Sequence, residues 1–232
     1  QSEEANRIET LLRTAKTDVE LWDVLEREVF SVIKRLKLDE DPEPAKETSK
    51  KPGRLPKAKI ESPTEDNARE KLQAFAQSSW HTLASFAPNY PTLLLLSTRQ
   101  LRSSFPASSL VLNILPTVKS LGRSSYALGA STLLYNELIG IYWMRYGNFD
   151  GIISLLKEMD NGGVGFDEGT LGLLEDIVLE AKKAVRGHFG RVLGAVYGME
   201  RFRGAFVEIE RWREEIGSRL EKEALRRAKK VE

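Results

Sequence analysis

The sequence has no cysteine and only two histidines, His81 and His188, among its 232 residues. Without thiols it can form neither disulfides nor thiolate nucleophiles, and two histidines alone do not make a Cys/His zinc site. Long apolar runs are also missing: runs such as 93–96 are far shorter than the roughly 20 residues that a membrane-spanning helix needs. The sequence therefore predicts no disulfide, no metal site and no direct membrane span.

Recognisable catalytic motifs are absent as well. The glycine-rich stretch 162–165 lacks the Lys-Ser/Thr pair of a phosphate-binding loop, and neither histidine has a carboxylate at helical spacing. The 35 basic and 34 acidic residues give a formal charge of +1, so the overall charge indicates no particular partner. We therefore expect a binding protein and not an enzyme, with no catalytic residue and no cofactor.

Prolines divide the chain into parts. Five of the nine lie in one stretch, at 42, 44, 52, 56 and 63. Because proline lacks a backbone N–H and this stretch has few apolar residues to bury, regular structure here would cost entropy without compensation. We predict an N-terminal helical segment at 1–37, a disordered or extended linker at 38–66 and a helical-repeat domain at 67–232.

The N-terminal segment carries a clear helix signal. Thr17 and Glu20 form a capping box, which marks a helix start. Apolar residues then recur three or four positions apart: Leu21, Trp22, Leu25, Val29, Val32, Ile33 and Leu36. Two helices alone bury little surface, so this segment should dock on the main body or on a partner.

Behind the linker, helical periodicity appears throughout and no stretch alternates with the period of a strand. Glycines and prolines separate segments that pair as antiparallel helices: 91–104 with 106–121, 124–146 with 149–160, and 168–186 with helices that reach about 230. Stacked pairs of this length are typical of α-solenoids. The predicted fold class is therefore all-α, with antiparallel helix pairs stacked on one another.

One segment resembles a pentatricopeptide repeat. It reads Leu-Tyr-Asn-Glu-Leu-Ile at 134–139, Tyr-Gly-Asn-Phe-Asp at 146–150, Leu-Leu-Lys-Glu-Met at 155–159 and Gly-Val-Gly-Phe-Asp at 163–167. Leu138 and Ile139 suit packing between helices, Gly147 suits a turn and Met159 fills a gap beside the next pair. The segment departs from the family pattern in two places. It has one extra residue between Asn136 and Gly147, and Phe166 stands where the family usually has proline. The neighbouring pairs lack the motif, so the resemblance implies a short, degenerate pentatricopeptide-like α-solenoid.

Three further stretches resemble the C-terminal domain of the fungal mitochondrial transcription-factor-two family: 15–22, 89–96, and 126–138 with 163–173. The likeness covers most of 15–38 and 70–215. It implies a non-catalytic factor of the mitochondrial matrix, or of the periphery of the inner membrane, that couples transcription to translation. It also implies three partners, which are mitochondrial messenger RNA, mitochondrial RNA polymerase and an inner-membrane-associated translation activator.

Candidate RNA-binding residues follow from the same segment. Asn136 and Asp167 occupy the two positions through which a pentatricopeptide repeat reads a base, and in that family an Asn/Asp pair implies uridine. Asn136 can instead bond local backbone groups, and Asp167 precedes a helix start, where a carboxylate serves as a cap. The basic candidates form two groups: Arg99, Arg102, Lys119 and Arg123, and Lys182, Lys183, Arg186 and Arg191. A charged helical surface would carry such residues even without RNA.

Aromatic side chains give the candidate partner surfaces. They are Trp22 on the N-terminal segment and Phe206 and Trp212 on the last helix, and a further group comprises Tyr142, Trp143 and Tyr146. Core packing is the more ordinary explanation of all of them. The alternative to an RNA-binding adaptor is a purely protein-binding scaffold or a mitoribosome-associated subunit.

Overall fold

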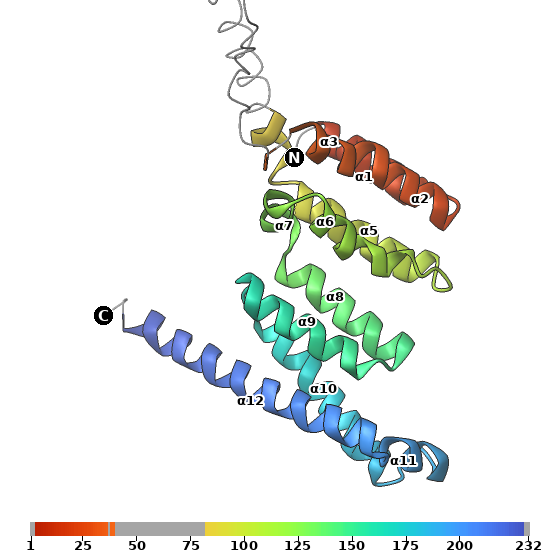
Figure 1. The fold of residues 1–232 in the computed structure, drawn as a ribbon, viewed down its shortest axis with the longest axis vertical. Coiled ribbons are helices and arrows are strands. Elements are labelled where there is room, and N and C mark those ends of the chain that lie inside the picture. The colour runs from red at the N-terminus through yellow and green to blue at the C-terminus, as the bar shows by residue number, and fades with distance from the viewer. Residues whose placement is uncertain (1–2, 37, 40–81, 230–232) are drawn as a thin grey trace, which may run out of the picture.

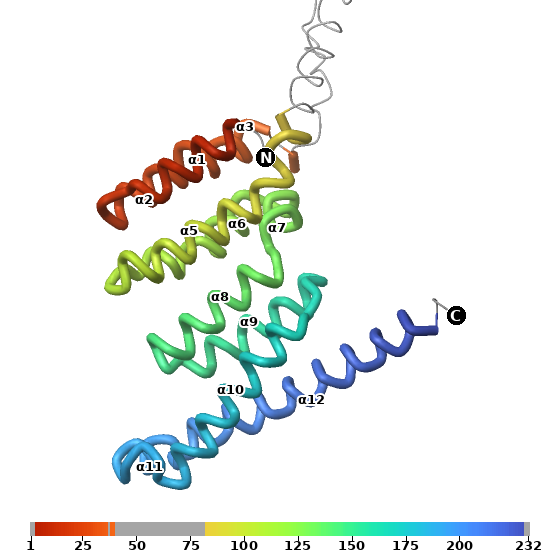
Figure 2. Tube along the Cα trace, turned by 180° about the vertical axis from the view of Figure 1, so that it is seen from behind, coloured from red at the N-terminus to blue at the C-terminus, as the bar shows by residue number. Residues whose placement is uncertain are grey.

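The computed structural model describes residues 3–36, 38–39 and 82–229, and within these ranges all regular structure is helical. The all-α class is therefore confirmed for this part of the chain. The helices lie in successive layers along the long axis of the molecule (Figure 1), in the same order when seen from behind (Figure 2). No helix within the described ranges combines the length and apolarity needed to cross a bilayer.

The first layer consists of α1 (Glu3–Thr14) and one continuous helix made of α2 (Asp18–Val24), the π-helical turn η1 (Leu25–Phe30) and α3 (Ser31–Leu36). The predicted start is confirmed, because Thr17 Oγ1 accepts a hydrogen bond from the Glu20 amide at 3.1 Å. The Glu20 carboxylate reaches one residue further back and accepts from the Lys16 amide at 2.9 Å. α1 packs against α5, so the N-terminal segment docks on the main body.

The second layer consists of α5 (Tyr90–Ser104), the 3-10 turn η2 (Leu110–Asn113), α6 (Ile114–Ser120) and α7 (Arg123–Gly129). Asp39, just after the N-terminal segment, caps α7, because its carboxylate accepts from the Ser124 amide at 3.0 Å and from the Ser124 hydroxyl at 2.6 Å. Gly122 precedes α7 with a φ of 109°, and a Cβ there would overlap the Asp39 carboxylate. The segments on either side of residues 40–81 are therefore joined by hydrogen bonds.

The third layer consists of α8 (Thr132–Ile141), the π-helical turn η3 (Tyr142–Tyr146) and α9 (Phe149–Gly162). The prediction of one helix over 124–146 is wrong, because α7 and α8 are separate. Ala130 leaves the helical conformation with a ψ of 90°, and Ser131 starts a new helix by accepting from the Leu134 amide at 3.3 Å. Gly147 ends η3 in the left-handed conformation, with a φ of 54°, as the turn prediction required.

The fourth layer consists of α10 (Glu168–Val185), α11 (Arg191–Tyr197) and α12 (Glu200–Ala228). α12 packs against α9 and α10 and buries Ala205, Ile209 and Ile216. Its C-terminal part extends beyond its neighbours in both views (Figures 1 and 2), and residues 221–229 are all exposed. The packed part of the last helix therefore extends as far as Ile216 and Leu220, and the exposed part follows it.

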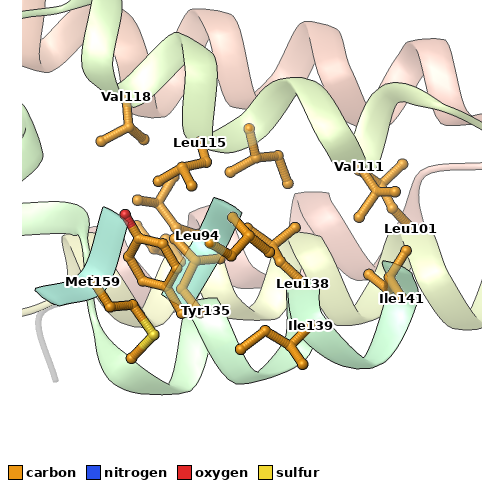
Figure 3. Close-up of a cluster of buried hydrophobic side chains, with 14 of the residues drawn as sticks. Leu94, Leu101, Val111, Leu115, Val118, Tyr135, Leu138, Ile139, Ile141 and Met159 are labelled. Carbon is orange, nitrogen blue, oxygen red and sulfur yellow. The ribbon is translucent and has the colours of Figure 1, made fainter. Parts of the chain in front are cut away.

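A continuous apolar core joins the layers. Figure 3 shows the part in which side chains of α5 and α6 meet those of α8 and α9. Ile139 and Met159 are fully buried, and Leu138 is 2% exposed, as the repeat-like pattern predicted. Leu94 of α5 is fully buried against them. Burying one such side chain contributes roughly 1.5–3 kcal/mol, so the apolar contacts stabilise the packing of these layers on one another.

The predicted linker at 38–66 lies outside the described residues, except for Leu38 and Asp39. His81 also lies outside them. The boundaries 1–37, 38–66 and 67–232 therefore stay predictions.

Candidate functional site

The structure brings together the two residues that the repeat-like pattern singled out. Asn136 on α8 donates through Nδ2 to Asp167 Oδ1 at 3.0 Å, and Asn136 Oδ1 accepts from the Thr170 hydroxyl at 2.8 Å. The Thr170 amide donates to the same Asp167 oxygen at 2.7 Å. Asn136 and Asp167 are half-buried and Thr170 is fully buried. The three side chains form a network that links α8 to the start of α10.

This network caps α10. Asp167 and Thr170 form a capping box in which each side chain bonds the backbone of the other residue. Burial raises the pKa of Asp167, but hydrogen bonds from the Thr170 backbone and from the Asn136 side chain outweigh burial, so its pKa lies below the ordinary value. The cap interpretation of Asp167 is therefore confirmed.

Asn136 keeps some capacity for a ligand. Its bonds to Asp167 and Thr170 use one of its two amide hydrogens and one of its two carbonyl lone pairs. A pyrimidine edge presents both a donor and an acceptor, which is the pattern that a carboxamide complements. The geometry is compatible with contact to one base, in addition to the capping role.

Three residues of the first basic group form ion pairs between layers. Arg99 Nε lies 2.6 Å from Glu137 Oε1, and Arg102 Nη1 lies 3.0 Å from Glu137 Oε2, with the Glu137 side chain only 12% exposed. Lys119 Nζ lies 2.5 Å from Glu158 Oε2. These cations tie α5 and α6 to α8 and α9, so they do not form a free cationic stripe.

Glu158 is the centre of a second polar network. Its Oε1 accepts from the Tyr135 hydroxyl at 2.5 Å, and the Tyr135 and Tyr126 hydroxyls are 2.9 Å apart. Burial, together with the neighbouring Glu158 carboxylate, raises the pKa of Tyr135. The Tyr135 hydroxyl therefore stays protonated and donates its hydrogen bond to Glu158, which suits a structural role.

The second basic group behaves differently. Lys182 Nζ lies 2.7 Å from Glu210 Oε1 on α12. Lys183, Arg186 and Arg191 are exposed, and no ion pair with another described residue holds them. Arg123, at the start of α7, is likewise exposed and free of an ion pair within the described ranges. The end of the molecule where α10 meets α11 therefore carries a free cationic cluster, which we define as Lys183, Arg186 and Arg191.

The candidate partner residues pack mainly within the chain itself. The Trp22 ring lies 6.0 Å from that of Phe30, and the Trp212 ring lies 6.0 Å from that of Phe166. Phe206 contacts Phe149 edge-on, with ring centroids 4.7 Å apart. All three candidates are half-buried, so each presents only part of its ring to a partner.

A cleft with aromatic walls lies between η3 and the start of α12. Its volume is about 550 Å³, and its lining residues are Leu112, Tyr142, Tyr146, Gly147, Asn148, Phe149, Asp150, Arg201, Phe202 and Ala205. Gly151 makes room for the Tyr142 ring, because a Cβ there would come within 2.6 Å of it. The sequence indicated the tyrosines as a group, but their meeting with α12, more than 50 residues later, had no local signal.

The described residues include no group of three or more acidic or histidine side chains that could hold a metal ion. His188 is exposed next to the cationic cluster.

A family model described as the Mtf2 family matches residues 1–232, the full length of the sequence. No curated protein and no solved structure matches the chain.

Proposed function

The chain belongs to the Mtf2 family, and we propose that it is a non-catalytic adaptor of mitochondrial gene expression that binds single-stranded RNA. Membership of this family indicates a mitochondrial protein with a transcription-factor role. RNA binding, coupling to translation and a location in the matrix are the further content of the proposal.

Within this proposal, the fold is a short and degenerate pentatricopeptide-like α-solenoid. The layered order of the helices supports this assignment, as do the contacts of α5 with α1 on one side and α8 on the other. In solenoids each repeat buries its apolar face against its neighbours and leaves an extended surface for a long ligand. RNA is such a ligand.

The observation that carries RNA binding is the free cationic cluster at the end of α10. Three exposed cations without ion-pair partners among the described residues favour an anionic ligand, since pairing with phosphates would release counterions. Cations at a helix C-terminus also stabilise the helix dipole, which accounts for Lys183 and Arg186 at the end of α10 but not for Arg191, the first residue of α11.

Helix α10 connects this cluster with the Asn136 network. Asp167 caps its first turn, and the 18 residues of the helix span about 27 Å. A strand of several nucleotides would cover that distance, with phosphates at Lys183 and Arg186 and one base at Asn136. We propose that this base is uridine, on the resemblance of Asn136 and Asp167 to the base-reading pair of a pentatricopeptide repeat.

The proposal extends to protein partners. It includes mitochondrial RNA polymerase, in line with the transcription-factor role of the family, and an inner-membrane-associated translation activator. An adaptor that holds RNA and these two proteins together would couple transcription to translation.

The test is RNA binding by a variant in which Lys183, Arg186 and Arg191 are all replaced with glutamine. We expect the affinity for a single-stranded oligonucleotide to fall by at least ten-fold. The slope of log K against log salt concentration should fall by about 2, since each lost phosphate contact on a single strand contributes about 0.7. Fluorescence anisotropy over a salt series measures both quantities.

The matched control replaces Lys16, Lys34 and Arg35 with glutamine, which removes the same charge from exposed positions of the N-terminal segment. This variant should bind RNA with nearly unchanged affinity and slope. Equal losses in the two variants would mean that only net charge matters, and absence of RNA binding by the unmodified chain would refute the proposal.

A purely protein-binding scaffold is the second candidate, and one observation favours it. Val185, Phe189 and Val192 lie among the cations with exposed fractions of 55%, 51% and 81%. Apolar side chains contribute little to phosphate binding, whereas they anchor protein interfaces. Partner binding that persists at high salt and after ribonuclease treatment would select this alternative.

A further inference from the structure

We infer that the aromatic cleft between η3 and α12 binds a nucleobase of the same RNA strand whose phosphates contact the cationic cluster. The inference rests on the proposed RNA binding and adds a site, a ligand class and a mode of recognition to it. The mode is stacking on aromatic rings, which differs from the edge recognition proposed for Asn136.

The walls of the cleft suit a flat aromatic ligand. Tyr142, Tyr146, Phe149 and Phe202 all line it. Phe149 is 4% exposed and forms an edge-to-face contact with Phe202, with ring centroids 5.9 Å apart, so this wall is rigid. Tyr146 is 40% exposed and is therefore available to a ligand. Base stacking on exposed aromatic rings is a principal source of affinity for single strands.

The polar groups of the cleft distinguish a base from a hydrocarbon. Asn148, Asp150 and Arg201 contribute to the lining beside the rings. Arg201 and Asp150 are 3.3 Å apart, but their side chains are 78% and 63% exposed, so the ion pair is weak and both groups can turn to a ligand. A base offers donors and acceptors on its edge, whereas a purely apolar ligand would leave these groups unsatisfied.

The size of the cleft also suits a nucleobase. Its volume of about 550 Å³ lies within the range of sites that enclose small molecules and leaves room for a base with its sugar. η3 is a π-helical turn that ends in the left-handed Gly147, and such turns occur frequently at functional sites.

Helix α11 connects the cleft with Arg191 of the cationic cluster. Tyr197, the last residue of α11, stacks on Phe202 with an interplanar angle of 9° and ring centroids 6.0 Å apart. Arg191 is the first residue of the same helix, whose seven residues span about 10 Å. An RNA strand on the cationic cluster would therefore reach the cleft within a few nucleotides.

The experiment compares Tyr146→Ala, Tyr146→Trp and the unmodified full chain in binding a ten-nucleotide single-stranded RNA of mixed sequence. We expect Tyr146→Ala to weaken binding about five-fold or more, in keeping with the loss of one stacked base. Tyr146→Trp should retain the affinity, because the larger ring also stacks. Met144→Ala is the matched control, since Met144 is 72% exposed on the same turn and does not line the cleft.

Photo-crosslinking with 4-thiouridine at single positions of the RNA supplies a second measurement. Cross-links to peptides that contain Tyr142 or Tyr146 are expected from one or two positions only. If the unmodified chain binds RNA but Tyr146→Ala binds equally well, or if Met144→Ala loses as much affinity, the cleft is not a base site and the proposed function is unaffected.

Two other results would also be decisive. If the unmodified chain binds no RNA, the proposed function fails and this inference fails with it. If 4-thiouridine monophosphate cross-links to the peptides with Tyr142 or Tyr146 while the labelled RNA, although bound, does not, the cleft is a site for free nucleotides, and its assignment to an RNA strand is overturned.

Discussion

Asp167 has a structural role that its proposed RNA role must respect. It caps α10 through the Thr170 amide and also bonds Asn136, so replacing it changes both the helix and the network. Asn136 is the better position for a test of base reading, because the cap survives without it.

We predict that Asn136→Ala weakens binding to a U-rich single strand about five-fold and to an A-rich strand much less. The expected loss corresponds to one hydrogen bond of about 1 kcal/mol. The control is Asn161→Ala, which makes the same chemical change at an exposed position of α9. Equal losses on both strands, or none on either, would leave Asp167 as a helix cap and remove base reading from the proposal.

Acid should weaken the cap at Asp167. Its pKa is lower in the folded chain than the ordinary value of 3.8, so the folded state binds this proton less readily than the unfolded state does. The stabilisation is complete above about pH 4 and is lost as the pH falls through the folded pKa.

We predict that Asp167→Ala lowers the free energy of unfolding by about 1 kcal/mol at pH 7 and by less at pH 3. Urea unfolding at the two pH values measures the difference. Glu168→Gln is the control, because Glu168 is exposed and is not the capping residue. A loss for Asp167→Ala that is as large at pH 3 as at pH 7 would show that the charge of Asp167 contributes nothing to the cap.

At the scale of elements, α7 depends on a residue that is distant in sequence. Asp39 caps it across 85 positions, and Gly122 supplies the space. We predict that Asp39→Ala lowers the free energy of unfolding by about 1 kcal/mol, as for loss of any good helix cap. Gly122→Ala should lower the free energy of unfolding by more. Alanine is strained at the positive φ of this position, and its Cβ would also overlap the Asp39 carboxylate.

Thermal unfolding followed by circular dichroism measures both variants, with Asp23→Ala as an exposed control on α2. The two substitutions act on one contact. The double variant should therefore lose less free energy of unfolding than the two single variants together. Strict additivity would mean that Asp39 does not hold α7.

Local signals in the sequence explain why most helices could be predicted. Thr17, Gly147 and Asp167 act on their own neighbours, and each begins or ends a helix where its residue type indicates. The break at Ala130 was missed because apolar periodicity continues through it, while Ser131 alone is a weak cap signal. Helix existence was therefore more predictable than helix continuity.

The candidate site was less predictable, because its character depends on distant pairs. Arg99 and Glu137 are 38 positions apart, so the sequence could not show that three residues of the first basic group are held in ion pairs. The Asn136 and Asp167 pairing was predictable only through the resemblance to a repeat with known spacing. Tyr146 and Arg201 line the same cleft because α12 packs beside η3, and no local pattern in the sequence determines that packing.

At the scale of the whole molecule, the first layer and the body form one apolar core. Ala5 and Ile8 of α1 line a small crevice together with Phe86 and Leu93, and Ile8 is only 1% exposed. Together with the Asp39 cap, these contacts should hold the N-terminal segment in place without a covalent connection to the rest of the chain.

We therefore predict that the two parts stay associated after the chain is cut. A recognition sequence for a site-specific protease is inserted after residue 60, and the cleaved protein is analysed by gel filtration. Residues 1–60 should elute together with the remainder, because the buried apolar contacts of α1 with α5 do not depend on chain connectivity. Ile8→Asp should release the N-terminal part after cleavage, since an unpaired carboxylate cannot be buried cheaply, whereas the exposed control Glu4→Gln should not. Dissociation of the cleaved but otherwise unmodified protein would mean that the N-terminal helices are held by the linker alone and are free to serve as a separate partner-binding module.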